Sequence, residues 1–260
     1  KFLLAQRYPE AQLCVPEEGD PYALMRMHTV TLISSEAAPC IHIRPIEGCT
    51  NEIGSMPDVL KELKEAYGRT NLFQMVTTDA GNTSCNVCDS IKKCLQCDYF
   101  SQIKSEHGSI YKEAERALSS KIDAKAGATY EDVQKGKSVT YYAWHCDLGK
   151  SGYHKWDHVR QLIRVKRVVE DSATGEQTIG NRYYACSRSS HHLGSRTALK
   201  ISRAHWRCEN ETHWTSDAEL MEDKRRLAWS QDPRGILVVS AVRMMALAIL
   251  SIARRLTHMD

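Results

Sequence analysis

Residues that could do chemistry are concentrated in thirteen positions of the last quarter of the chain. The run from 205 to 217 reads His-Trp-Arg-Cys-Glu-Asn-Glu-Thr-His-Trp-Thr-Ser-Asp. At 3.6 residues per turn, His205, Glu209, His213 and Asp217 follow one another at i, i+4 spacing and share one face of a predicted helix. Imidazoles and carboxylates on one face predict metal binding or acid–base catalysis.

Asp79 is the second candidate. It follows residues 72–78, a mostly apolar run typical of a strand covered on both faces, and α/β sheets place ligand and catalytic groups at such strand ends. The alternative role is a turn or N-cap residue before a helix that starts near Thr83. Asp79 and Glu209 are 130 positions apart (209 − 79) and could meet only through tertiary structure. Together they would hold divalent metal ions for phosphoryl transfer.

The elements that must position these carboxylates follow from apolar periodicity and turn residues. In chain order the pattern predicts a hairpin of strands at 28–34 and 41–46, a helix at 51–67 that ends at Gly68, a strand at 72–78, a helix from 83 to about 93, and a strand at 99–104. The last three of these elements form a β-α-β unit.

The chain changes character between residues 126 and 192. Three β-prone runs, 139–144, 161–169 and 182–186, are separated by turn-forming residues and lack helical periodicity. Helical patterning returns from Ser195 onward. We therefore predict an α/β fold with a mixed sheet, in four parts: an N-terminal segment at 1–27, a first α/β part at 28–125, a β-rich insertion at 126–192, and a helical part at 193–260.

Three motifs together resemble a known family. They are Thr50-Asn51-Glu52-Ile53, the run Val76-Thr77-Thr78-Asp79-Ala80-Gly81, and the pattern HW-x-x-EN-x-x-HW-x-x-D-x-x-x-x-ED from His205 to Asp223. The sequence is similar to the DDE-type transposases of bacterial insertion sequences, and most of all to the ISAs or H-repeat-associated family, from about residue 24 to about residue 256.

The resemblance implies a fold, an activity and a set of site residues. The fold is an RNase H-like α/β domain with a β-rich insertion before the last catalytic helix. The activity is cleavage and joining of DNA strands at transposon ends with Mg²⁺ or Mn²⁺, in the bacterial cytoplasm, by a homodimer on paired double-stranded DNA ends. Asp79 and Glu209 resemble the second and third catalytic carboxylates, which bind the metal. Candidate DNA-binding residues are Lys104, Arg203, Arg207, Asn210 and Trp206, although Trp206 and Trp214 also fit a packing role.

The sequence departs from the family pattern in two places. The first catalytic Asp of the family lies on a strand before the hairpin, and residues 1–27 contain no such segment, because Asp20 precedes a proline and is predicted to lie in a loop. Lys104 matches a lysine of the family, but Ser105-Glu106-His107 replaces the Gly-Asn-Gln that often follows that lysine. We expect the first Asp to lie upstream of Lys1 or the gene to be a degenerate copy, which would lack strand-transfer activity.

Two zinc sites are alternatives. Cys85-x-x-Cys88 and Cys94-x-x-Cys97 have zinc-ligand spacing, with buried free thiols as the other interpretation. His205, Glu209 and His213 could also bind zinc, although their spacing is not that of HExxH.

Composition leaves several classes open. With 260 residues, 42% of them hydrophobic, the chain can bury a core as one large domain or two smaller ones. The net charge is only +3, but basic residues cluster in the last quarter, which indicates an anionic partner. Ten cysteines are expected to be reduced thiols or metal ligands. Residues 236–253 are strongly apolar, but Arg243 and Arg254-Arg255 favour a buried amphipathic helix, and we predict no transmembrane segment.

Three functions therefore remain: a metal-dependent DNA transposase, a catalytically inactive DNA-binding remnant of one, and a zinc-binding protein.

Overall fold

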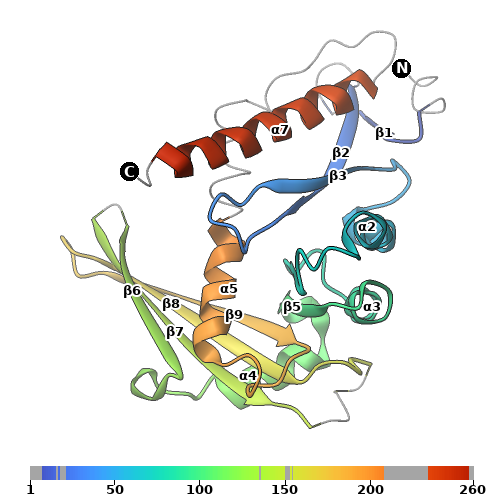
Figure 1. The fold of residues 1–260 in the computed structure, drawn as a ribbon. Coiled ribbons are helices and arrows are strands. Elements are labelled where there is room, and N and C mark those ends of the chain that lie inside the picture. The colour runs from blue at the N-terminus through green and yellow to red at the C-terminus, as the bar shows by residue number, and fades with distance from the viewer. Residues whose placement is uncertain are drawn as a thin grey trace. The chain divides into compact units, whose positions relative to one another are not determined.

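The computed structural model describes residues 8–15, 17, 22–134, 136–149, 153, 155–207 and 234–257. It is a mixed α/β protein with a curled mixed sheet and flanking helices (Figure 1). The chain divides into two compact units, residues 1–63 with 204–260 and residues 64–203. Each unit is described separately.

The first unit contains a three-stranded antiparallel sheet in the order β1-β2-β3. Its strands are β1 (Ala11–Cys14), β2 (Tyr22–Thr31) and β3 (Cys40–Ile46). β2 and β3 pair antiparallel with a register shift at Val30/Thr31, so the predicted hairpin is confirmed. β1 was not predicted, because four residues are too few to show an alternating pattern.

Helix α2 (Glu52–Tyr67) confirms the helix expected at 51–67. It begins where the side chain of Asn51 accepts a hydrogen bond from the backbone N–H of Gly54 at 2.9 Å. Met56, Leu60 and Leu63 are buried, as their helical spacing predicts.

Helix α7 (Arg234–Thr257) corrects the expectation of a buried helix. Met244 and Leu247 are buried and the helix contacts β3, but the opposite side carries exposed large apolar residues. α7 is the one described helix that is long and apolar enough to cross a membrane by length and composition. Its pattern is therefore apolar on two sides, and only one side is covered.

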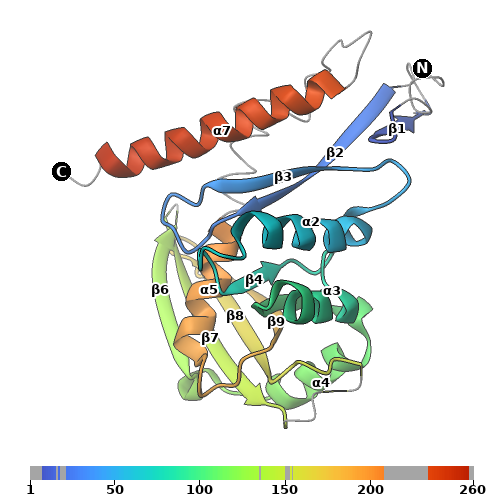
Figure 2. The ribbon, with the colours of Figure 1, turned by 45° about the vertical axis from the view of Figure 1, so that its right-hand side comes forward.

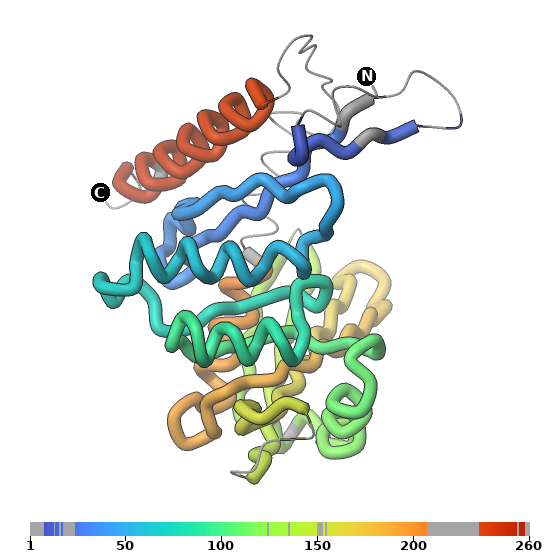
Figure 3. Tube along the Cα trace, turned by 90° about the vertical axis from the view of Figure 1, so that its right-hand side faces the viewer, coloured from blue at the N-terminus to red at the C-terminus, as the bar shows by residue number. Residues whose placement is uncertain are grey.

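The second unit is built on a six-stranded sheet in the order β4-β5-β9-β8-β7-β6. β4 (Met75–Thr78) and β5 (Asp98–Ile103) are parallel, and α3 (Cys85–Ser90) connects them (Figure 3). This confirms the β-α-β unit. The predicted helix through about residue 93 is confirmed in extent, but its last part, Ile91–Leu95, is a π-helix rather than an α-helix and ends at Gln96 in the left-handed region (φ 60°).

The β-rich segment continues this same sheet. β6 (Ala128–Gln134), β7 (Lys137–Asp147), β8 (Gln161–Asp171) and β9 (Gln177–Cys186) form an antiparallel meander, and β9 pairs antiparallel with β5. β6 was not predicted, because its residues are mostly polar and exposed. The strands described above as an insertion are thus hydrogen-bonded to the β-α-β unit.

Helices cover both faces of the six-stranded sheet (Figure 2). The first turns of α5 (Ser195–Arg207) pack Ala198 and Leu199 against Phe100, Ile163 and Tyr184. α4 (Ser109–Leu118) buries its own apolar stripe and contacts β7, β8 and β9. Because strand side chains alternate between faces, the edge-to-face contact of Tyr111 with Tyr183 places α4 on the face opposite α5.

A buried arginine joins α4 to the sheet. Arg164 of β8 is 7% exposed, and its Nη1 donates to the carbonyl groups of Leu118 and Ser119 at 2.8 and 3.0 Å. Its Nε donates to Asn181 Oδ1 at 2.9 Å, and its guanidinium lies 4.8 Å from the centre of the Trp144 ring. The side chain therefore satisfies carbonyl groups that the end of a helix leaves without intrahelical partners.

An ion cluster fixes the start of β5. Asp98 Oδ1 is 2.7 Å from Lys92 Nζ of the π-helix and accepts from Ser187 Oγ at 2.7 Å, while Oδ2 accepts from Arg188 Nε at 2.5 Å. Burial raises the pKa of this carboxyl group, but the bonds from Lys92, Arg188 and Ser187 outweigh burial and lower the pKa to about 2. The cluster holds β5, the π-helix and the end of β9 together.

We predict that this cluster makes stability depend on pH in the acid range. The pKa of Asp98 is lower in the folded state than in the unfolded chain, so its contribution is fully present above about pH 4 and is lost as the pH falls toward 2. Asp98→Asn should lower the unfolding free energy by about 2 kcal/mol at pH 7 and by much less at pH 2. Urea unfolding at both pH values measures this, with the exposed Asp157→Asn as control. Equal losses for Asp98→Asn at both pH values would contradict the assignment.

Candidate metal-binding site at the end of strand β4

Asp79 lies in the turn that follows β4 and is half-buried. Its Oδ1 accepts a hydrogen bond from the backbone N–H of Asn82 at 3.0 Å, so the carboxylate braces its own turn. The N-cap of α3 is Ser84, whose Oγ accepts from the backbone N–H of Val87 at 3.1 Å. The N-cap role considered for Asp79 therefore belongs to Ser84.

Buried hydroxyl groups of β4, β5 and the turn itself form hydrogen bonds that support this turn. Thr78 Oγ1 lies 2.8 Å from Thr83 Oγ1 and 2.8 Å from Ser101 Oγ of β5. Thr83 Oγ1 donates to the carbonyl oxygen of Asp79 at 2.6 Å. The chain of hydroxyls thus connects the backbone of Asp79 to the neighbouring strand. Sequence reasoning missed it, although threonines directly before and after the turn were the available signal.

Lys104 lies at the same edge of the sheet as Asp79. β4 and β5 are parallel with Thr78 opposite Ser101, so their carboxyl ends meet at one edge, where Asp79 and the exposed Lys104 follow the two strands. The resemblance names both residues as candidate site residues, and the strand register puts them at the same edge of the sheet.

His107 links the two strand ends. The backbone N–H of Lys104 donates to His107 Nδ1 at 3.0 Å. The other ring nitrogen, Nε2, is 3.1 Å from the carbonyl oxygen of Thr83. The Ser-Glu-His segment that departs from the family pattern therefore ties the end of β5 to the Asp79 turn.

α5 runs in the same direction as β5. Ser195 at its start lies beside Gly127, just before β6, and Arg203 two turns later contacts Tyr130 of β6. β6 and β5 run in the same direction, because four successive antiparallel pairings connect them. The end of α5 therefore lies beside β6, at the opposite end of the strand order from β4 and the Asp79 turn.

The predicted DNA-binding residues of α5 have different surroundings. The guanidinium of Arg203 lies 3.5 Å from the centre of the Tyr130 ring and its Nη2 is 3.5 Å from Asp132 Oδ2, so it contacts strand β6. Trp206 is half-buried and meets the His205 ring edge-on at 6.4 Å. From Ser195 to Arg207 the helix has no acidic residue, and Arg196 and Lys200 are exposed.

Several predicted site residues lie outside the described residues. These are Glu209 and Asn210, together with His213, Trp214, Asp217 and Asp20; Arg207 ends α5, but its side chain is also outside. Their roles stay predictions. Among the described residues there is no group of three or more His, Cys, Asp or Glu that could hold a metal ion.

Among the described residues, the four cysteines of the CxxC pairs do not come together as a group of three or more metal ligands. Cys88 is buried and directs its Sγ at Ser101 Oγ, 3.5 Å away, whereas Cys97 directs its Sγ at the carbonyl oxygen of Phe73, 3.9 Å away. Burial raises the pKa of the Cys88 thiol to about 12, which disfavours the thiolate that zinc requires. The free-thiol interpretation fits these contacts better.

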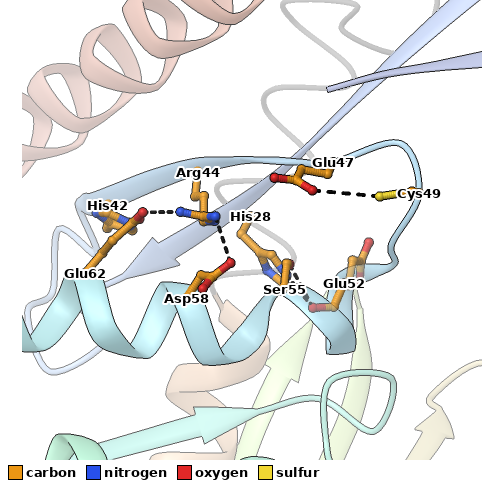
Figure 4. Close-up of polar contacts among 9 residues, drawn as sticks. All are labelled: His28, His42, Arg44, Glu47, Cys49, Glu52, Ser55, Asp58 and Glu62. Atoms are coloured by element: carbon orange, nitrogen blue, oxygen red, sulfur yellow. Dashed lines mark hydrogen bonds and ion pairs between the residues drawn. The ribbon is translucent and has the colours of Figure 1, made fainter. Parts of the chain in front are cut away.

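The Thr50-Asn51-Glu52 motif lies in the first unit and anchors the start of α2. Arg26 donates to the carbonyl oxygen of Thr50 at 2.6 Å, and the buried His28 Nε2 is 2.7 Å from the carbonyl oxygen of Glu52 (Figure 4). Farther along the helix, Arg44 pairs with Glu62 and with Asp58, and His42 also pairs with Glu62. These contacts give the motif a structural role in holding α2 on the hairpin.

Comparison of the chain with protein-family models and with curated proteins returned no match. The sequence motifs and the geometry of the Asp79 turn are therefore the basis for assigning a function.

We predict that removing the central hydroxyl of the network destabilises the second unit. Thr78→Val keeps the shape of the side chain but leaves the hydroxyls of Thr83 and Ser101 without this partner in a buried place. The expected cost is about 1–3 kcal/mol in unfolding free energy, measured by urea denaturation. Thr178→Val, at an exposed strand position of β9, is the matched control and should change stability by less than about 0.5 kcal/mol. Similar values for both variants would show that the network contributes nothing.

Proposed function

We propose that this chain is a DDE-type transposase of the ISAs or H-repeat-associated kind, in which Asp79 supplies one of the carboxylates that bind the catalytic metal. The observation that carries the proposal is the position of Asp79: it follows the parallel strand β4 at the carboxyl edge it shares with β5. Ligand and catalytic groups of α/β sheets gather at such edges.

The described architecture agrees with an RNase H-like domain at a coarse level. A parallel β-α-β unit, helices on both faces of a mixed sheet, and a β-rich segment before α5 are the features that the resemblance implies. The pairing of Glu209 with Asp79 is taken from the sequence motifs; α5, which ends two positions before Glu209, runs in the same direction as β5. We assign the RNase H-like fold as part of this proposal.

In this proposal carboxylates would bind the metal ion, and basic side chains would contact the DNA. Asp79 and Glu209 would hold Mg²⁺ or Mn²⁺, which supplies charge stabilisation and an activated nucleophile for phosphodiester cleavage. The hydroxyl network and His107 would keep the Asp79 turn in one conformation. Lys104 at the same edge, and the exposed Arg196 and Lys200 of α5, would contact DNA phosphates.

One observation favours the second candidate, a DNA-binding remnant without strand-transfer activity. β1 precedes the hairpin, as the strand with the family's first Asp does, but its residues Ala11–Cys14 include no carboxylate. Two carboxylates could still bind a metal ion weakly. The two candidates differ in DNA cleavage and share metal and DNA binding.

We predict that Mn²⁺ binding depends on both carboxylates. Asp79→Asn and Glu209→Gln should each weaken Mn²⁺ affinity by about 10-fold or more, because each removes a charged oxygen ligand. Titration calorimetry measures the affinity. Asp171→Asn, which changes the carboxylate at the end of β8, is the control and should bind Mn²⁺ as the wild type does. Wild-type affinity in Asp79→Asn would refute the assignment of this residue.

A DNA assay then separates the candidates. Supercoiled DNA nicked in Mg²⁺ or Mn²⁺ by the wild type, and left intact by Asp79→Asn, supports the transposase. Salt-sensitive DNA binding without nicking supports the remnant. Stoichiometric zinc in the purified protein, with no DNA binding, would contradict both candidates.

A further inference from the structure

Helix α7 carries an exposed apolar stripe with heptad spacing. Its members are large apolar residues between 43% and 64% exposed: Val238, Val242, Met245, Ile249, Ile252 and Leu256. Successive members are separated by four, three, four, three and four residues. This is the alternation of a and d positions in a coiled coil, with Val242, Ile249 and Leu256 at a and the others at d. We call this stripe the α7 seam.

The rest of α7 is arranged around the seam. Ser240, Met244 and Leu247 are the buried residues of the helix, and they occupy positions f, c and f, on the side opposite the seam. α7 contacts β3 of its own unit, so its c and f side is engaged within the first unit. One side of the helix thus packs within the first unit, while the seam on the other side is exposed.

The residues that flank the seam allow a second helix to approach closely. Four of the e and g positions hold alanine: Ala241, Ala246, Ala248 and Ala253. Small residues beside the contact line permit interaxial distances at the short end of the usual 8–10 Å range. No acidic residue occurs in α7; Arg243 and Arg254 lie at b and f, away from the seam, whereas Arg234 and Arg255 lie at g, at its two ends. In a parallel pair a g position faces an e position of the other helix, and the e positions of α7 hold valine and alanine, so no arginine of one copy would face an arginine of the other.

We propose that the α7 seam is a self-association surface, and that the α7 helices of two copies of this chain pack on each other as a two-helix coiled coil. A second copy is the occupant because the seam is self-complementary, with a and d residues on one helix that fit the matching spacing on another. Since the other side of each helix stays on its own β3, each copy offers one seam, which favours a pair.

A membrane is the competing occupant, and the described contacts favour it less. α7 has the length and apolar composition of a membrane span, but insertion would separate Met244 and Leu247 from the unit in which they are buried. It would also place Arg243 near the middle of the bilayer. Moreover, a membrane would not require apolar residues to keep a heptad spacing.

We predict that a charge in the seam breaks the pair, whereas a charge beside it does not. Ile249 at position a is 64% exposed, and the adjacent Leu250 at position b is 50% exposed. Ile249→Glu should weaken dimerisation by about 30-fold or more, as expected for a central interface residue. Leu250→Glu should leave it within about 3-fold. Sedimentation equilibrium of the whole chain, without DNA, measures both constants, and far-UV circular dichroism checks that each variant keeps its helix content.

The outcomes are distinct. A wild-type dimer that Ile249→Glu and Met245→Glu convert to monomer, while Leu250→Glu remains dimeric, supports the proposal. A wild-type monomer, a larger assembly, or equal effects at 249 and 250 would overturn it. So would flotation of monomeric wild type with phosphatidylcholine vesicles. The pairing requires neither metal nor DNA, so its failure leaves the proposed function untouched.

Discussion

The hydrogen bonding of β5 to unlike neighbours on its two sides is the constraint on which the second unit depends. β5 is parallel to β4 and antiparallel to β9, and its residues from Tyr99 to Ile103 are buried. The parallel pair of β4 and β5 requires a crossover connection, which α3 and the π-helix provide. The antiparallel pair of β5 and β9 joins the meander of β6 to β9 to the same sheet. Asp98 stands where these connections meet, because its carboxylate binds a cation from the π-helix and another from the end of β9.

The position of the candidate site is a consequence of that pairing. Parallel strands finish on the same side of a sheet, so the turn after β4 and the segment after β5 become neighbours without any direct contact between their charged side chains. Buried hydroxyl groups and the His107 imidazole then hold the backbone at this edge. They act on the carbonyl groups of Asp79 and Thr83, so they fix the turn without using the Asp79 carboxylate.

The sequence predicts what local pattern determines and misses what distant partners determine. The hairpin, α2 and the β-α-β unit follow from apolar spacing and from Gly68 and the Asp79 turn. The π-helix does not follow from the sequence, because the residue types of Ile91–Leu95 are those of an ordinary α-helix. Its wider turn ends at Gln96 and places Lys92 beside Asp98. Arg188, the other cation, is 90 positions from Asp98. The positions of Asp79 and Lys104 at strand ends follow from the sequence, whereas the contacts of Thr83 and His107 depend on how β4 and β5 pair in the folded chain.

The high average hydrophobicity of α7 comes from two different surfaces, one buried and one exposed. Its composition suggests uniform burial, yet the residues at c and f positions pack within the first unit while those at a and d stay exposed. An ideal α-helix drifts by about 20° per heptad relative to a 3.5-residue repeat, so the seam rotates by only about 50° between Val238 and Leu256. A helix this short can keep all six seam residues on one side without strong supercoiling. Its packing on β3 is therefore compatible with a second helix on the opposite side, and neither contact has to be given up for the other.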